Sequence, residues 1–228
     1  MRLIKFLTLS VAMSRNQAKF FIRKGRASVD GKIRTDPNFE LFDSSHVVFD
    51  GKAISVISYQ YLMLHKPSGF TCGAKDKKYI SALELVKNRS KDRKYYFANA
   101  VTPEFTGLVL ISDDIRWISR LKLKLQKKTG IYQVRLKNIF RENQLQQLQK
   151  AWIASAGNKI GTTIEIKKQN ERTLLLNVSQ SRAADINGML TSVDFKIETL
   201  QLQQIGRLSL GSLKEGDCLQ LAASEIKV

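Results

Sequence analysis

The sequence predicts an α+β protein of two domains: a small basic α/β domain over residues 1–58, then a larger domain over residues 61–228. The larger domain is expected to hold a mixed, mainly antiparallel β-sheet with flanking helices. Two basic helical segments and a few short strands fill the first part. Many strand-like segments with hairpin-length joints and few helices follow, as in antiparallel sheets. At 228 residues, 43% hydrophobic, the chain is long enough for a small and a medium core.

The first domain begins with two helical patterns. Leu3, Phe6 and Leu7 fall on one helical face. Ser14 is a suitable N-cap for a second helix, and Gly25 is suited to end it. The cations of this second segment fall mainly opposite its apolar stripe; they are Arg15, Lys19, Arg23, Lys24 and Arg26.

Two hairpins are predicted to complete the first domain. Residues 27–29 form a strand that is followed by Asp30-Gly31. Residues 46–49 and 52–56 flank Asp50-Gly51. Asp-Gly between strands is a strong signal for a tight two-residue turn, because both turn positions need positive φ.

The second domain shows strand and helix patterns in an irregular order. Strands are predicted at residues 61–65, 107–112, 132–136, 163–167, 173–178 and 195–200, with a turn at 168–171. Helices are predicted at residues 80–86, 115–125, 142–154 and 185–193. On the helix at 115–125 the cations project away from the apolar face; they are Arg116, Arg120, Lys122 and Lys124.

The charge of the chain indicates a polyanionic partner. Lys and Arg total 38 against 20 Asp and Glu, which gives a net charge of +18 and a pI near 10.0. Nucleic acid is the commonest such partner, and the clustering of the cations favours it over a merely solvated basic surface.

Cysteine and histidine usage predicts neither disulfides nor a metal site. Cys72 and Cys218 are far apart in sequence, and His46 and His65 make no ligand pair, so a reducing cytoplasm is the simplest compartment. Residues 1–13 imitate a secretory signal, but Lys5 interrupts the apolar run and a capped helix follows, so we interpret them as folded structure. No apolar stretch reaches the roughly 18 residues of a membrane span, and no membrane partner is expected.

The pattern of residues 1–58 resembles the S-four-type RNA-binding domain. The matching elements include Ser14-Arg15, Gly25-Arg26 and Asp30-Gly31-Lys32. Helix-borne cations would then face phosphates while the small sheet holds the helices at a fixed angle. The residues expected to contact RNA are Arg2, Lys5, Ser14, Arg15, Lys19, Arg23, Lys24, Arg26 and Lys32. The alternative is an ordinary amphipathic helix with a solvated charged face.

Four segments in order resemble the RsuA-type RNA pseudouridine synthases. They are residues 61–69, which end in Lys-Pro-Ser-Gly; residues 107–114, an apolar strand ending on acids; residues 131–134, with Tyr132; and residues 205–219. The family isomerises uridines within RNA, using a catalytic Asp and a tyrosine that packs on the flipped base, without cofactor or metal.

The resemblance also implies that the catalytic carboxylate is missing here. Where the family carries Gly-Arg-Leu-Asp, this chain has Asn99, Ala100, Val101 and Thr102. Tyr132 is retained, and Asn187 falls at the position of the basic partner of the carboxylate. A threonine hydroxyl carries no charge near neutral pH, so it cannot replace the aspartate directly.

Two hypotheses follow. The first is a monomeric RNA-binding protein, acting on structured RNA such as rRNA or its precursor, in which catalysis is lost. The second is an active pseudouridine synthase that uses a displaced carboxylate, with Glu104 and Asp113 as the candidates nearest in sequence. In either case Thr102 and Tyr132 are expected to lie across one cleft.

Overall fold

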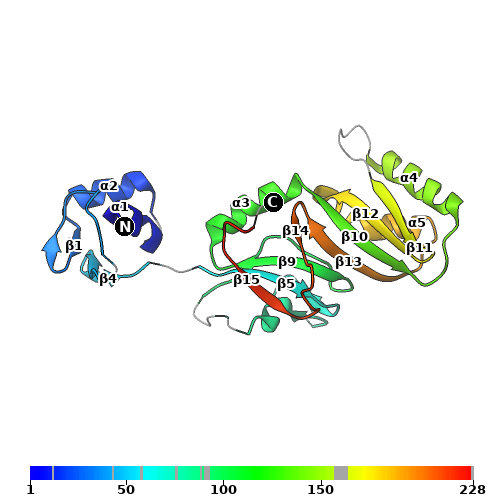
Figure 1. Cartoon of the computed structure of the whole chain (residues 1–228), viewed down its shortest axis with the longest axis horizontal. Coiled ribbons are helices and arrows are strands. Elements are labelled where there is room, and N and C mark those ends of the chain that lie inside the picture. The colour runs from blue at the N-terminus through cyan, green and yellow to red at the C-terminus, as the bar shows by residue number, and fades with distance from the viewer. Residues whose placement is uncertain are drawn as a thin grey trace. The chain divides into compact units, whose positions relative to one another are not determined.

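The computed structural model describes residues 1–11, 13–42, 44–56, 59–74, 77–87, 89, 93–156 and 164–226. The chain divides into two compact units, Met1–Ser58 and Tyr59–Val228 (Figure 1). Each unit has a hydrophobic core of its own.

The helices of the first unit begin and end where the capping residues predict. α1 spans Leu3–Ser10 and α2 spans Arg15–Arg23. The Ser14 hydroxyl accepts from the Gln17 N–H, and the Gln17 side chain accepts from the Ser14 N–H at 2.8 Å, which makes a capping box. Gly25 follows α2 with a φ of 73°, the left-handed conformation that favours glycine at a helix end.

The sheet of the first unit consists of the two predicted hairpins. Its order is β2-β1-β3-β4, with all pairs antiparallel. The strands are β1 (Ala27–Val29), β2 (Lys32–Ile33), β3 (Val47–Phe49) and β4 (Lys52–Ile54). Both Asp-Gly turns have positive φ at both residues, as expected for the tight turn type that matches the strand twist. Apolar residues of α1, α2, β1 and β3 pack into one core.

The second unit is built on a nine-stranded sheet with the order β11-β12-β10-β13-β9-β5-β15, to which β8 and β14 are attached. The strands are β5 (Tyr61–Lys66), β8 (Tyr96–Phe97), β9 (Thr106–Ser112), β10 (Thr129–Leu136), β11 (Glu165–Asn170), β12 (Thr173–Ser179), β13 (Ile197–Ile205), β14 (Leu208–Ser209) and β15 (Cys218–Leu221). All pairs in this sheet are antiparallel except β9 with β13. β6 (Phe70–Thr71) and β7 (Ile80–Ser81) form a separate parallel pair. The architecture is the mixed, mainly antiparallel α+β fold that was predicted.

Three helices flank this sheet: α3 (Ile115–Gln126), α4 (Glu142–Ala156) and α5 (Asp185–Ser192) (Figure 1). The Asp114 carboxylate caps α3 by accepting from the N–H groups of Arg116 and Trp117, both at 3.0 Å. α3 buries Ile118, Leu121 and Leu125, the apolar stripe that its sequence predicts.

Several local predictions are wrong. The segment at 80–86 is the strand β7 followed by a short 3-10 helix, Ala82–Leu85, rather than an α-helix. β13 begins at Ile197, two residues later than predicted, and it continues to Ile205 because both of its sides are paired. β11 continues through the predicted turn to Asn170; it is an edge strand with exposed polar residues, which look like a turn in sequence. Thr163 lies outside the described residues.

Gly107 allows β9 and β13 to meet. Its φ is +140°, and a Cβ built there would lie 2.5 Å from the backbone N of Leu202 and 2.7 Å from the Leu202 oxygen. Because those atoms are backbone, a side chain here would have to separate the two strands. The close approach joins the two halves of the sheet beside the loop at 100–106.

Candidate functional site

A cavity of about 440 Å³ lies where the two halves of the second unit's sheet meet. Thr71, Cys72 and residues 100–106 line one side of it. The other side comes from Tyr132 on β10, from the segment 183–187 at the start of α5, and from Leu200 and Leu202 on β13. Thr102 and Tyr132 therefore line the same cavity.

Two side chains, those of Asn99 and Lys66, hold the loop that carries Thr102, and the sequence analysis gave this role to neither of them. Asn99 is fastened to β9: its Nδ2 donates to the Leu108 carbonyl at 2.8 Å, and its Oδ1 accepts from the Leu110 N–H at 3.0 Å. Lys66 is 0% exposed. Its Nζ donates to three backbone carbonyls, those of Pro67 (2.9 Å), Phe70 (2.9 Å) and Phe105 (2.8 Å).

Lys66 is therefore a structural cation. Its three hydrogen bonds tie the segment after β5 to the loop after Thr102. Burial lowers the pKa of its ammonium group. All three donors of an ammonium group are used, so none is left for a ligand. The Lys-Pro-x-Gly sequence could have indicated this position, but nothing in its spacing reveals the partners.

Tyr132 is only 6% exposed, and its ring forms part of the cavity wall. Its hydroxyl accepts from the Gln180 side-chain amide at 2.9 Å. Burial raises the pKa of Tyr132 to about 12, although the hydrogen bond from Gln180 opposes this shift. The Gln180 N–H in turn donates to the carbonyl of Lys128, just after α3, at 2.8 Å. The tyrosine is thus fixed in a neutral, anchored state.

The cavity wall is almost free of charge. Glu104 is the one acidic residue that lines it, and no lysine or arginine does so among the described residues. The hydroxyl of Tyr79 donates to the Glu104 carboxylate at 2.8 Å, and this hydrogen bond lowers the pKa of Glu104. Asn187 and Ala100 also line the cavity and are exposed. Burial raises the pKa of the Cys72 thiol, so it stays protonated near neutral pH.

Two other charged residues, Asp113 and Arg182, lie outside the cavity wall. Asp113 follows the far end of β9, where its carboxylate accepts from the Gln60 N–H at 2.8 Å and pairs with Arg93 at 2.9 Å. It does not line the cavity. Arg182 is buried, pairs with Asp185 at 2.9 Å and lies over the Trp152 ring. Of the two candidate carboxylates, the cavity therefore includes Glu104 alone.

The cations of the first unit surround two hollows. One, of about 380 Å³, is lined by residues of α1 and the start of α2: Met1, Arg2, Ile4, Lys5, Thr8 and Arg15. The other, of about 540 Å³, is lined by one face of α2: Asn16, Lys19, Phe20, Arg23 and Lys24. Phe20 is 56% exposed, so this basic face also offers an aromatic ring.

The remaining predicted RNA contacts have other surroundings. Arg26 pairs with Asp50, which raises the pKa of Arg26, and its guanidinium lies 4.3 Å from the ring centroid of Phe21. The Ser14 hydroxyl accepts the capping bond of α2. Lys32 is exposed on β2. Arg26 thus differs from the α2 cations in having an acidic partner.

Comparison with known proteins agrees with this architecture. Residues 1–41 match the S4 domain family. Over 232 residues, the chain is 29% identical to an uncharacterized RNA pseudouridine synthase of Aquifex aeolicus, covering 100% of this chain and 95% of the relative. It is 27% identical to the ribosomal small subunit pseudouridine synthase A of Vibrio parahaemolyticus and 26% identical to that of Escherichia coli, in each case over 99% of this chain and 98% of the relative. The chain therefore has an S4 domain and is strongly similar, along its whole length, to the RsuA-type pseudouridine synthases.

A solved structure supports the same fold. A crystal structure of a pseudouridylate synthase aligns over 99% of this chain and 97% of its own, with a TM-score of 0.61 and 24% identity. The alignment spans both units of this chain, so the solved structure shows the fold that each of them has.

Among the residues that the structure describes, no helix has the length and apolar character needed to cross a bilayer. The same part of the chain contains no cluster of three or more His, Cys, Asp or Glu side chains suited to a metal ion.

Proposed function

We propose that this protein binds structured ribosomal RNA without converting uridine to pseudouridine. The proposal rests on one observation: the cavity is lined by Thr102 where the family carries its aspartate, and by no lysine or arginine among the described residues. The family relationship supports an RNA partner, and the curated relatives are named for the small ribosomal subunit.

The chemistry of the cavity supports the loss of catalysis. Reaction at the sugar requires a carboxylate as nucleophile or base. Thr102 is exposed and uncharged, and its hydroxyl is a poor nucleophile unless a base lies beside it. Ala100 and Asn187 supply no positive charge to hold a carboxylate in its ionised form. The cavity thus lacks both the carboxylate and its cationic partner, so neither charge is left there without the other.

An active synthase that uses Glu104 is the alternative. One observation favours it: Glu104 lines the cavity, and the hydrogen bond from Tyr79 lowers its pKa, so the carboxylate is ionised. The same hydrogen bond argues against it, because the carboxylate is exposed and already turned toward Tyr79.

The deciding experiment is a search for pseudouridine. Total RNA from cells with and without this protein is compared by mass spectrometry and carbodiimide mapping, and purified protein is incubated with an unmodified small-subunit rRNA transcript. We expect binding of the transcript and no pseudouridine in either assay. If a modified uridine disappears on deletion and the purified protein restores it, the proposal is wrong. Loss of that activity in Glu104→Gln would then identify the displaced carboxylate.

Restoring the aspartate alone should not restore the reaction. In Thr102→Asp the new carboxylate lacks a cationic partner, since Asn187 occupies that position. We expect no pseudouridine from Thr102→Asp in the transcript assay. Pseudouridine formed by this single variant would show that the rest of the site is intact.

We also assign the protein to the cytoplasm, where ribosomal RNA is available to it, and we expect a monomer. Sedimentation of the purified chain at a mass near 25.9 kDa would agree with this, and a mass near twice that value would not.

A further inference from the structure

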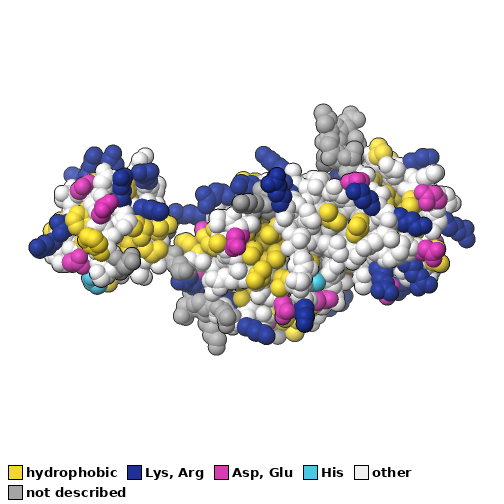
Figure 2. Space-filling model, in the orientation of Figure 1, with side chains coloured by type: hydrophobic (Ala, Val, Ile, Leu, Met, Phe, Trp, Pro, Cys, Tyr) yellow, Lys and Arg dark blue, Asp and Glu magenta, His cyan; other side chains and the backbone are white. Residues whose placement is uncertain are grey.

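The exposed side of α3 carries a row of cations in the second unit. From Ile115 to Lys128 the chain contains six cations and no acidic residue; they are Arg116, Arg120, Lys122, Lys124, Lys127 and Lys128. All six are exposed, and none takes part in an ion pair among the described residues. Figure 2 shows dark blue side chains gathered over this helix.

Helix geometry aligns four of these cations. Arg116, Arg120 and Lys124 are spaced four residues apart, about 6 Å along the axis, and Lys127 follows three residues later. Because residues three and four apart lie on one face, the four side chains form a single stripe. A charge row of this kind can contact successive phosphates of one nucleic-acid strand.

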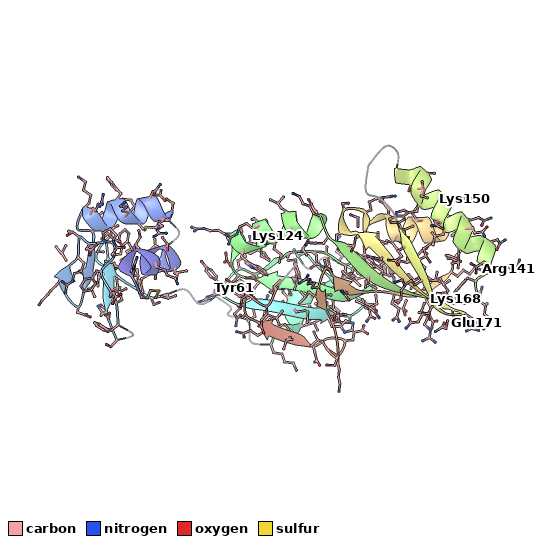
Figure 3. The ribbon with its side chains drawn as sticks, turned by 45° about the horizontal axis from the view of Figure 1, so that its top comes forward. Tyr61, Lys124, Arg141, Lys150, Lys168 and Glu171 are labelled. Carbon is pink, nitrogen blue, oxygen red and sulfur yellow. The ribbon has the colours of Figure 1, made fainter. Side chains whose placement is uncertain are left out.

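Other cations of this unit have a different setting. Around α4 and the β11–β12 turn, Arg141 and Arg172 are adjacent in sequence to Glu142 and Glu171. Elsewhere on the same sheet, Arg135 pairs with Glu198 and Lys167 with Glu165, both at 3.1 Å. In Figure 2, dark blue and magenta are mixed at this end, and Figure 3 labels Arg141, Lys150, Lys168 and Glu171 there and Lys124 on α3. The cations of α3 therefore differ from these in having no acidic neighbour along the helix and no ion pair among the described residues.

The C-terminal end of α3 is also connected to the cavity. The carbonyl of Lys128 accepts from the Gln180 N–H at 2.8 Å, and the Gln180 side chain donates to the Tyr132 hydroxyl at 2.9 Å. The end of the cation row is thus two hydrogen bonds from the ring that lines the cavity.

We propose that the cation stripe of α3 binds the phosphates of the RNA strand whose nucleotide enters the cavity. This would be a contact surface of the second unit, separate from the cations of α2. The inference rests on the proposed function, since it needs an RNA ligand. A membrane surface is the other polyanion that a basic helix can bind. RNA is favoured because the apolar face of α3 is buried in the core at Ile118, Leu121 and Leu125 and is not available for lipid.

The test compares two charge-matched variants of the full chain. The first is Arg116→Gln, Arg120→Gln and Lys124→Gln on α3. The second, the control, is Arg141→Gln, Arg172→Gln and Lys150→Gln, which removes the same two arginines and one lysine from the mixed-charge end. All six positions are exposed, so both variants should keep the wild-type melting temperature. Affinity for the small-subunit rRNA transcript is measured as a function of salt.

We expect the α3 variant to bind about tenfold or more weakly and to flatten the slope of log affinity against log salt by about two to three units. The control variant should change both the affinity and the salt slope by much less than the α3 variant does. Binding of both variants to vesicles of phosphatidylserine and phosphatidylcholine is measured in parallel. Equal effects of the two variants on transcript binding would overturn the inference. An α3 variant that binds the transcript as the wild type does, but has lost binding to the vesicles, would also overturn it. The proposed function would survive either result, provided that the wild type still binds the transcript. A wild type that fails to bind it would overturn the proposed function itself.

Discussion

The exposed face of α2 and the wall of the cavity differ in the charged side chains that they present. On α2, Lys19 and Arg23 are exposed around one hollow and lie beside the aromatic ring of Phe20. The cavity, in contrast, is lined by the uncharged side chains of Thr102 and Asn187 and by no lysine or arginine among the described residues. Positive charge is thus exposed on α2, whereas Glu104 is the one charged side chain of the cavity wall among the described residues. Under the proposed function, RNA binding and catalysis depend on separate sets of side chains.

Lys66 is an intermediate case, because it is a cation close to the cavity loop that takes no part in the cavity wall. Its ammonium group stabilises the loop through three carbonyls. It also shows why a count of lysines says little about a binding surface. The following experiments test whether the exposed cations of α2 bind RNA, whether Lys66 stabilises the structure and whether the cavity wall is buried.

Lys66→Met should have the largest effect, because it tests whether the buried cation is structural. The substitution leaves three carbonyl acceptors without their donor, and we expect it to lower the free energy of unfolding by about 3 kcal/mol or more. Chemical denaturation measures this value. Lys122→Met on the exposed side of α3 is the control and should stay within about 0.5 kcal/mol of wild type. A stable Lys66→Met protein would mean that the carbonyls find other partners and that Lys66 does not hold the loop.

Replacing Arg15, Lys19 and Arg23 by Ala tests the α2 surface. We expect weaker binding of the rRNA transcript and a slope of log affinity against log salt that is flatter by about three units, roughly one for each lost phosphate contact. The same composition removed elsewhere, in Arg141→Ala, Lys150→Ala and Arg172→Ala, should leave the slope close to wild type. An unchanged slope in the α2 variant would mean that this face is only solvated.

Titration of Tyr132 gives the smallest signal and tests the burial of the cavity wall. A raised pKa means that the stabilisation from the buried phenol is present below pH 10 and is lost as the pH rises through about 12. Near pH 11, an ordinary tyrosine of pKa about 10 is mostly phenolate, whereas Tyr132 is not. The phenolate absorbance of wild type and Tyr132→Phe should therefore be nearly equal at that pH. A deficit of about one phenolate in the variant would mean that the ring is open to solvent.

Much of the fold could be predicted from local signals. The capping box at Ser14, the two Asp-Gly turns and the apolar stripe of α3 are confirmed, because each depends on residues that are close in sequence. The wrong boundaries of β11 and β13 have the opposite cause. An edge strand with polar side chains looks like a turn, and the end of a central strand is set by its neighbours in the sheet.

For the site, the sequence and its resemblance to the pseudouridine synthases led us to expect a threonine where the family has an aspartate, a retained tyrosine and an asparagine where the family has a cation. Tertiary structure brings Thr102, Tyr132 and Asn187 to one cavity, includes Glu104 in its wall and leaves Asp113 outside it. It also revealed the roles of Lys66, Asn99 and Gln180, whose partners come from distant segments. The physical reason is that the chemical type of each side chain can be read directly from the sequence. Its burial and its hydrogen-bond partners depend on segments that are distant in the sequence and meet only when the strands pair.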